Sequence, residues 1–165
     1  LVTVVTEYMP ASWSQESIQY GPLNVGRGDR GFYQHWPSPQ VSSIRISGTG
    51  EYALKVTYHE MGHRFEDVVG DVPGQNQTPV GRLSQEFYER RTAGKPLRHM
   101  GVGYRPDEMT RPNGFVSPYI GKQYRGPNNH EILSMGLEGI YMNTNDLLRR
   151  DTDMADFILG LLGGI

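Results

Sequence analysis

His59, Glu60 and His63 form a His-Glu-x-x-His pattern near the middle of the chain. On a helix, side chains four residues apart differ by about 40° in direction, so both imidazoles can bind one Zn²⁺. Glu60 follows the first of them and can reach a water beside such a metal and take its proton. The chain contains only five His, so a chance match to this pattern is improbable. The pattern therefore predicts metal chemistry.

The segment Glu51–Val69 has the periodicity of a helix that could present this motif. Apolar residues recur along it at steps of three and four, namely Leu54, Tyr58, Met61, Phe65 and Val68. Projected at about 100° per residue, the two motif His lie roughly opposite that stripe, on the same side as Glu66. We expect one face to pack on a core and the other to line a cleft. The alternative is an amphipathic surface helix with two solvated His.

Composition limits the class of protein and the kind of metal site. A chain of 165 residues suggests one domain that can bury a core, and 21 Gly, 11 Pro and a mean hydropathy of -0.55 indicate many loops and short elements. The net charge of -2 provides no electrostatic footprint for nucleic acid or an anionic membrane. The absence of Cys excludes disulfides and thiolate zinc sites, so metal ligands must be His, Asp or Glu.

Neither end of the chain indicates targeting to a membrane. The first five residues are short and lack the basic region of a signal peptide, and the apolar run of about ten residues near the C-terminus is too short to span a bilayer. The start at Leu1 instead of Met predicts that the chain is a fragment of a longer polypeptide.

Strand and loop signals flank the motif helix. Leu1–Val5 is rich in β-branched residues and predicts an edge strand, and Pro10–Pro39 predicts irregular structure. Val41–Ser47 alternates weakly and predicts a short strand, after which Thr49 could cap the motif helix. Leu97–Thr110 predicts a hairpin or paired extended segments.

Three further helices are predicted after the motif helix. Their apolar periodicity and the Gly and Pro residues at their ends place them at Val80–Ala93, Glu131–Leu148 and Asp153–Leu162. Short strands combined with these helices indicate an α+β fold.

A catalytic zinc usually takes three protein ligands and keeps a fourth position for water, so a third ligand is needed. The known extension of the motif, with Gly and His after the second motif His, is absent, because Glu66 and Val69 stand there. Glu66 lies on the same helix as both His, and one straight helix cannot place three ligands tetrahedrally around a metal. We therefore expect Glu66 to support a ligand instead of binding the metal. The formally available side chains are His35, His99, Glu66, Glu86, Glu89, Glu131 and Glu138.

Glu131 and Glu138 differ by about 20° in direction on the third predicted helix, so both could face the motif helix. Either one would complete a site of two His and one Glu. Glu131 also stands three residues after Asn128 and suits a capping box. Residue spacing alone leaves these alternatives open.

Two later segments resemble a known family. Residues 113–124 (NGFVSPYIGKQY) and 131–138 (EILSMGLE), taken with the motif at 59–63, resemble the zincin-like domains of bacteriophage head proteins and related bacterial toxin-like modules. The resemblance covers roughly residues 50–141, more than half of the chain. These domains are similar in layout to gluzincins of the lethal-factor type, in which a Glu opening a later helix is the third ligand and an upstream Tyr stabilises the transition state.

The resemblance assigns roles to particular residues. It implies Glu131 as the third zinc ligand and Tyr124 as the catalytic Tyr, with Tyr119 as the second candidate. In many gluzincins an acidic residue one turn after the Glu ligand supports the first His, and Met135 stands at that position here. That support is then expected from Glu66, from Glu138 or from Asp67.

The resemblance also implies a fold and a function. The fold over residues 1–165 would be a single zincin-like domain, with a small mixed or antiparallel sheet packed on the motif helix and a second helix group forming a cleft. The function would be zinc-dependent hydrolysis of peptide bonds in a peptide or protein substrate, with Gly101–Tyr104 as an edge strand for it.

The same sequence features are compatible with two other functions. One is a structural or assembly module of a phage head or virion whose zinc is mainly structural, and the other is a toxin effector protease. The larger polypeptide would then be of phage or toxin type. The compartment would be the virion, the cytoplasm or, for a secreted protein, the exterior.

Overall fold

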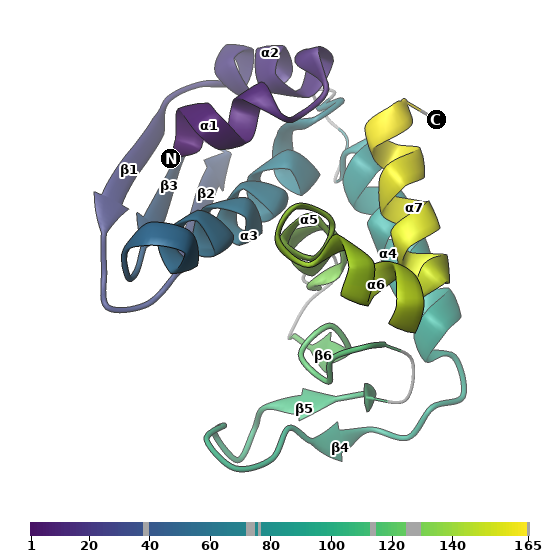
Figure 1. Cartoon of the computed structure of the whole chain (residues 1–165). Coiled ribbons are helices and arrows are strands. Elements are labelled where there is room, and N and C mark those ends of the chain that lie inside the picture. Colours follow the sequence, from purple (N-terminus) through teal and green to yellow (C-terminus); the bar gives the residue numbers. More distant parts are fainter. Residues whose placement is uncertain (38–39, 72–74, 76, 113–114, 125–129, 165) are drawn as a thin grey trace.

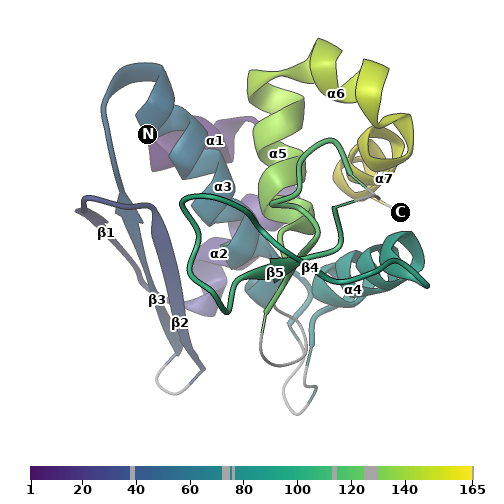
Figure 2. The ribbon, with the colours of Figure 1, turned by 90° about the horizontal axis from the view of Figure 1, so that it is seen from below.

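Helix α3 (Gly50–Val68), which carries the motif, runs through the middle of the molecule (Figure 1). In the computed structural model, one sheet lies beside α3 and helix α5 (Ile132–Met142) lies on its other side, as Figure 2 shows from below. The structure describes residues 1–37, 40–71, 75, 77–112, 115–124 and 130–164. Met61 and Phe65 of α3 are fully buried, so the predicted motif helix and its apolar stripe are confirmed.

The sheet beside α3 has three strands in the order β1 (Leu23–Arg27), β3 (Gln40–Ile46) and β2 (Phe32–Pro37). Strand β1 is parallel to β3 and β2 is antiparallel to it, so the sheet is mixed. The strand predicted around residues 41–47 is confirmed as β3, whose Ile44 and Ile46 are buried in the core. Within the described part of the chain, the outer edge of β2 pairs with no strand.

The predictions for the N-terminal region were wrong. The expected strand at Leu1–Val5 is helix α1 (Val2–Glu7), and the region expected to be irregular contains helix α2 (Ala11–Tyr20) as well as β1 and β2. Helix α1 buries Val5 completely, and tertiary burial of this kind overrides the strand preference of Val. Thr49 precedes α3 as its N-cap residue, but its side chain makes no capping hydrogen bond.

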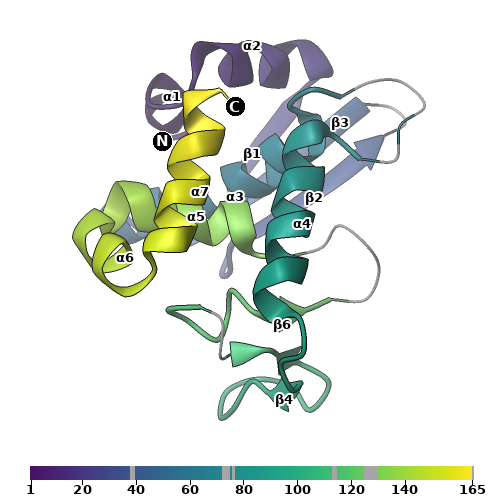
Figure 3. The same cartoon turned by 90° about the vertical axis from the view of Figure 1, so that its right-hand side faces the viewer.

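A group of helices stands on the opposite side of α3 from the sheet. Helices α4 (Pro79–Thr92) and α7 (Thr152–Gly163) lie side by side (Figure 3), with the rings of Phe87 and Phe157 stacked 4.2 Å apart. Both helices were predicted, and both are confirmed. The third predicted helix is broken, because Asn143 leaves the helical conformation (φ -146°) between α5 and α6 (Thr144–Arg150).

A second, very small sheet lies below the helices in Figure 3. It has three antiparallel two-residue strands in the order β4 (Arg98–His99), β5 (Met109–Thr110) and β6 (Lys122–Gln123). The predicted hairpin is therefore confirmed. Residues 101–104 form its turn and not an edge strand, because Gly101 and Gly103 adopt positive φ angles of 105° and 93°.

The fold class is mixed α+β, as the sequence predicted. The described residues form seven helices and two small sheets. None of the described helices combines the length and the apolar character needed to cross a membrane.

Candidate metal centre

Glu131 meets both motif His at the start of α5. Its Oε2 lies 3.2 Å from Nε2 of His59 and 3.2 Å from Nε2 of His63. One ligand atom from each of the three residues lies within 4.8 Å of the other two. The Glu131 side chain is 1% exposed, so the cluster is closed off on its α5 side. The structure thus brings together the three residues proposed as metal ligands.

The carboxylate of Glu131 is oriented by its neighbours. Ser134 Oγ donates to its Oε2 over 2.8 Å, and the hydroxyl of Tyr124 donates to its Oε1. Glu131 is itself the N-cap residue of α5, so it does not hold the third helical position that a capping box beginning at Asn128 requires. Asn128, the other half of that box, lies outside the described residues, as do residues 113–114 of the resembling segment.

Each motif His also faces a second carboxylate. Glu138 Oε2 lies 3.6 Å from Nδ1 of His59, and Glu66 Oε2 lies 3.7 Å from Nδ1 of His63. Glu66 and Glu138, two of the three residues expected to support the ligands, therefore stand beside the ring nitrogens that face away from Glu131. Asp67, the third, lies beside His35 instead. A carboxylate in this position fixes the orientation of an imidazole ligand and raises its basicity.

The electrostatics of the cluster follow from this arrangement. Burial opposes a charged imidazole, but the carboxylates of Glu131 and Glu138 raise the pKa of His59 to about 9. Burial likewise opposes charge on His63, yet Glu131 and Glu66 raise its pKa well above the ordinary value. Burial would raise the pKa of Glu131, but His63 and His59 hold it well below its ordinary value. A cation is therefore favoured next to Glu131, and a metal ion would replace the imidazole protons.

Glu60 lies at the same site, where its side chain is largely buried. Burial raises the pKa of its carboxyl, and the nearby His59 and His63 oppose that shift only in part. A Cβ on Gly31 would come within 2.5 Å of Glu60 Oε1, so the backbone just before β2 passes directly over the carboxylate. Glu60 is thus a confined carboxylate with raised proton affinity, as a general base requires.

Tyr124 and Tyr119 both stand close to the cluster. Besides the Tyr124 contact with Glu131, the ring of Tyr119 lies 6.1 Å from the ring of His59. Burial raises the pKa of both phenols, so both stay protonated and can donate hydrogen bonds. The sequence analysis did not identify Lys122 as part of this site. Its Nζ lies 4.6 Å from the ring centre of Tyr124 and 5.3 Å from that of Tyr119.

The cluster opens into a cleft of about 570 Å³. Its walls include residues 30–35, from the loop before β2 and from β2 itself, and Asp67 at the end of α3. A second hollow of about 370 Å³ shares Arg30, His59 and Tyr119 with the cleft and continues along the opposite end of α3. The groove therefore extends to both sides of the cluster. Sequence reasoning missed the β2 wall, because this region was predicted to be irregular.

The other side chains considered as third ligands lie outside the cluster. His35 lines the cleft, but its Nδ1 faces Asp67 at 3.8 Å. His99 is exposed on the hairpin, where Nε2 is 2.9 Å from the carbonyl oxygen of Arg105. Glu86 and Glu89 are exposed on α4.

The chain matches no protein-family model, no curated protein and no solved structure.

Proposed function

We propose that the protein is a zinc-dependent metalloendopeptidase with a zincin-like domain. One observation carries this proposal: the 3.2 Å separations between Glu131 Oε2 and the two His Nε2 atoms. Ligands at about 2.0–2.1 Å from a tetrahedral zinc are separated by about 3.3 Å, so these three side chains need little movement to hold the ion. Two imidazoles and a carboxylate are also a donor set used by catalytic zinc, which keeps its fourth position open.

The arrangement of elements around the cluster supports the zincin-like part of the proposal. A mixed sheet flanks the motif helix on one side, and the helix that starts after Glu131 packs on the other. The cleft lies between them, with β2 along one wall. This is the layout that the resemblance to gluzincins implies.

The shape of the groove favours an extended peptide as the substrate. The outer edge of β2 is unpaired within the described structure, so its backbone can add a strand from another chain. The groove is open on both sides of the cluster, which suits cleavage within a chain and not only at its end. In this proposal β2, instead of residues 101–104, is the edge strand that pairs with the substrate.

The residues of the chain have distinct tasks in this reaction. Zinc, when bound by His59, His63 and Glu131, supplies Lewis acidity and lowers the pKa of a water to about 7. Glu60 takes the proton from the attacking water and delivers it to the leaving amine. Tyr124 donates a hydrogen bond to the oxyanion of the tetrahedral intermediate, with Tyr119 beside it.

A structural zinc site in an assembly module is the second candidate function. One observation favours it: the Tyr124 hydroxyl is engaged with Glu131, not free in the cleft. Such a module would bind zinc and gain stability from it without cleaving peptides. A toxin effector protease would share the proposed chemistry and differ only in its substrate.

Zinc content and peptide cleavage, measured together, test the proposal. Protein purified without chelator should carry about one zinc per chain by elemental analysis and cleave members of an unbiased peptide library. His63→Ala should lose both properties, whereas Glu60→Gln should keep zinc and lose cleavage. His99→Ala, which changes an exposed His outside the cluster, serves as the matched control and should keep both. Zinc binding without cleavage would support the structural candidate, and a wild-type protein that binds no zinc would refute both.

A further inference from the structure

Asp67 continues the line of the two His ligands along the cleft. His59, His63 and Asp67 are spaced by four residues on α3, so each lies about 6 Å further along the helix axis on nearly the same side. Successive inward residues of strand β2 lie opposite successive residues of this helix face. The ring of Tyr33 stacks on that of His63, with ring centres 6.2 Å apart, and His35 Nδ1 lies 3.8 Å from Asp67 Oδ2. Two strand residues span about 6.6 Å, so β2 and α3 stay in register along the cleft.

A peptide bound along β2 would therefore pass the metal ligands and then Asp67. Asp67 lies about 6 Å further along the helix axis than His63, a rise similar to the length of an extended Lys or Arg side chain. Asp67 can consequently reach a side chain of a residue that flanks the scissile bond.

The Asp67 carboxylate is available for such a contact. Its side chain is 41% exposed and lines the cleft, and His35 is its one ion-pair partner within 4 Å among the described residues. Burial raises the pKa of Asp67, whereas a hydrogen bond from the Tyr33 hydroxyl and the nearby His35 oppose that shift. The exposed part of the carboxylate remains open to the cleft. His35 is in turn engaged by the hydroxyl of Tyr20, which lies 3.0 Å from its Nε2. Arg64, the nearby arginine of α3, is fully buried and donates to the Ser17 side chain and to backbone carbonyls of α2 and Gly21 instead.

The carboxylate of Glu66, the residue before Asp67, is not accessible to a substrate. Glu66 is 7% exposed, faces His63 and His130, and accepts a hydrogen bond from the backbone N–H of Leu133 over 3.3 Å. Asp67 is thus the acidic group at this end of the cleft that a substrate can meet.

We infer that Asp67 forms a specificity site for a Lys or Arg side chain next to the scissile bond. This inference rests on the peptidase function proposed above and adds the class of substrate. An ion pair at a partly exposed site is worth up to about a fivefold preference, and an acidic side chain at the same position would be repelled.

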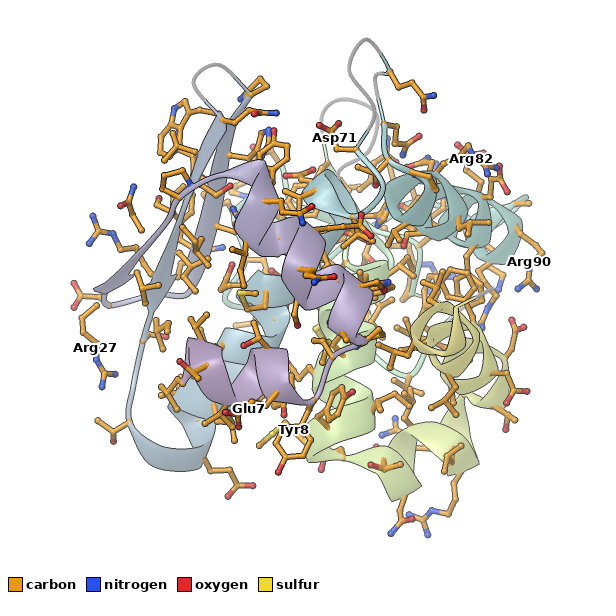
Figure 4. The ribbon with its side chains drawn as sticks, turned by 90° about the horizontal axis from the view of Figure 1, so that it is seen from above. Glu7, Tyr8, Arg27, Asp71, Arg82 and Arg90 are labelled. Carbon is orange, nitrogen blue, oxygen red and sulfur yellow. The ribbon has the colours of Figure 1, made fainter. Side chains whose placement is uncertain are left out.

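Matched peptides test this inference. One peptide cleaved in the library digest is resynthesised with Lys or with its uncharged isostere norleucine at each position that flanks the scissile bond. The ratio of kcat/KM for the two peptides is then measured for the wild-type protein, Asp67→Asn and Asp67→Glu. Asp71→Asn is the control, because Asp71 follows α3 (Figure 4) but is not among the residues that line the cleft.

The wild-type protein should prefer Lys at one of these positions by about fivefold. Asp67→Asn should bring the ratio close to one, whereas Asp67→Glu and Asp71→Asn should keep the preference. A wild-type ratio near one at every position, or an unchanged ratio in Asp67→Asn, would overturn the inference and leave the peptidase function standing. If no peptide in the library is cleaved, the peptidase function fails and the inference falls with it.

Discussion

Gly62 of α3 lies directly against the backbone of Ser134 in α5. A Cβ on Gly62 would come within 2.5 Å of Ser134 Cα and within 2.8 Å of Ser134 N. Gly62 stands between the two motif His, and Ser134 stands one turn after Glu131. The contact between these two backbones therefore sets how close Glu131 comes to His59 and His63.

Gly62→Ala should separate α3 from α5. The methyl group meets backbone atoms that cannot rotate away, so the variant should lose about 1–3 kcal/mol of unfolding free energy. Zinc affinity should fall as well, because Glu131 moves with α5. Urea unfolding and a zinc titration against a competing chelator measure the two effects.

Gly163→Ala is the matched control for this prediction. Gly163 is also helical, it is exposed, and a Cβ there meets no atom within 4 Å. Its replacement should be neutral or stabilising by up to about 1 kcal/mol. If Gly62→Ala kept both the stability and the zinc affinity of the wild-type protein, the contact would not control the position of Glu131.

The placement of His59 and His63 was predictable from the sequence, because helical spacing alone puts both on one side of α3. Glu131 was not predictable in this way, since helical geometry made Glu131 and Glu138 equivalent and only the family resemblance separated them. The structure gives them different positions. Glu131 faces Nε2 of both His, and Glu138 faces Nδ1 of one.

The N-terminal third was not predictable from local patterns. Helix α2 is docked by Arg64, whose Nε donates to Ser17 Oγ over 2.8 Å inside the core. Apolar periodicity assigns neither a serine nor an arginine to a core. Strand β2 was not predicted for a related reason. Its residues are only exposed or half-buried, so the strand has no strong apolar face that a sequence pattern could indicate.

Glu131→Ala and Glu138→Ala should differ strongly in their effect on zinc. The first would remove one of the three proposed zinc ligands and should weaken binding by orders of magnitude. The second removes a carboxylate behind His59 and should lower zinc affinity about 10–100-fold. Competitive zinc titration measures both. Glu138 also pairs with Lys55 over 3.1 Å, so Lys55→Ala is the control and should leave zinc affinity near that of the wild-type protein. The reverse order of the two Glu variants would make Glu138 the ligand.

The metal-free protein should lose stability as the pH rises from about 6.5 to about 9. The folded-state pKa of His59 is about 9, above the ordinary 6.5, so its charged form stabilises the fold fully below pH 6.5 and not above pH 9. His63 contributes in the same direction. Glu131 acts oppositely: its pKa lies well below the ordinary 4.5, so its contribution is present above that value and is lost as the pH falls.

Melting temperatures of chelator-treated protein between pH 5 and pH 10 measure this dependence. Stability should be highest between about pH 5 and pH 6.5. Saturating zinc should remove most of the alkaline decline, because the metal takes the place of the imidazole protons. A metal-free melting temperature that stays level or rises between pH 6.5 and pH 9 would mean that the two His are not paired with Glu131 in solution.

Tyr124 could act in either of two ways, and its contact in the structure shows which measurements distinguish them. Its hydroxyl donates to Glu131 Oε1, so it could hold a zinc ligand in place. It could also turn this donor towards the oxyanion of a bound substrate. In the first task Tyr124→Phe weakens zinc binding, and in the second it lowers the rate of the chemical step.

We expect Tyr124→Phe to lower kcat while zinc content and melting temperature stay near those of the wild-type protein. Ser134 Oγ still orients Glu131 in this variant, through a hydrogen bond of 2.8 Å to Oε2. An interaction made mainly in the transition state appears in kcat and not in KM, and removal of one oxyanion donor lowers kcat about 10²–10³-fold. Steady-state kinetics on a peptide from the library digest measure the effect, with Tyr119→Phe for comparison. A fully active Tyr124→Phe beside a crippled Tyr119→Phe would give the role to Tyr119, and full activity in both variants would show that neither phenol is catalytic.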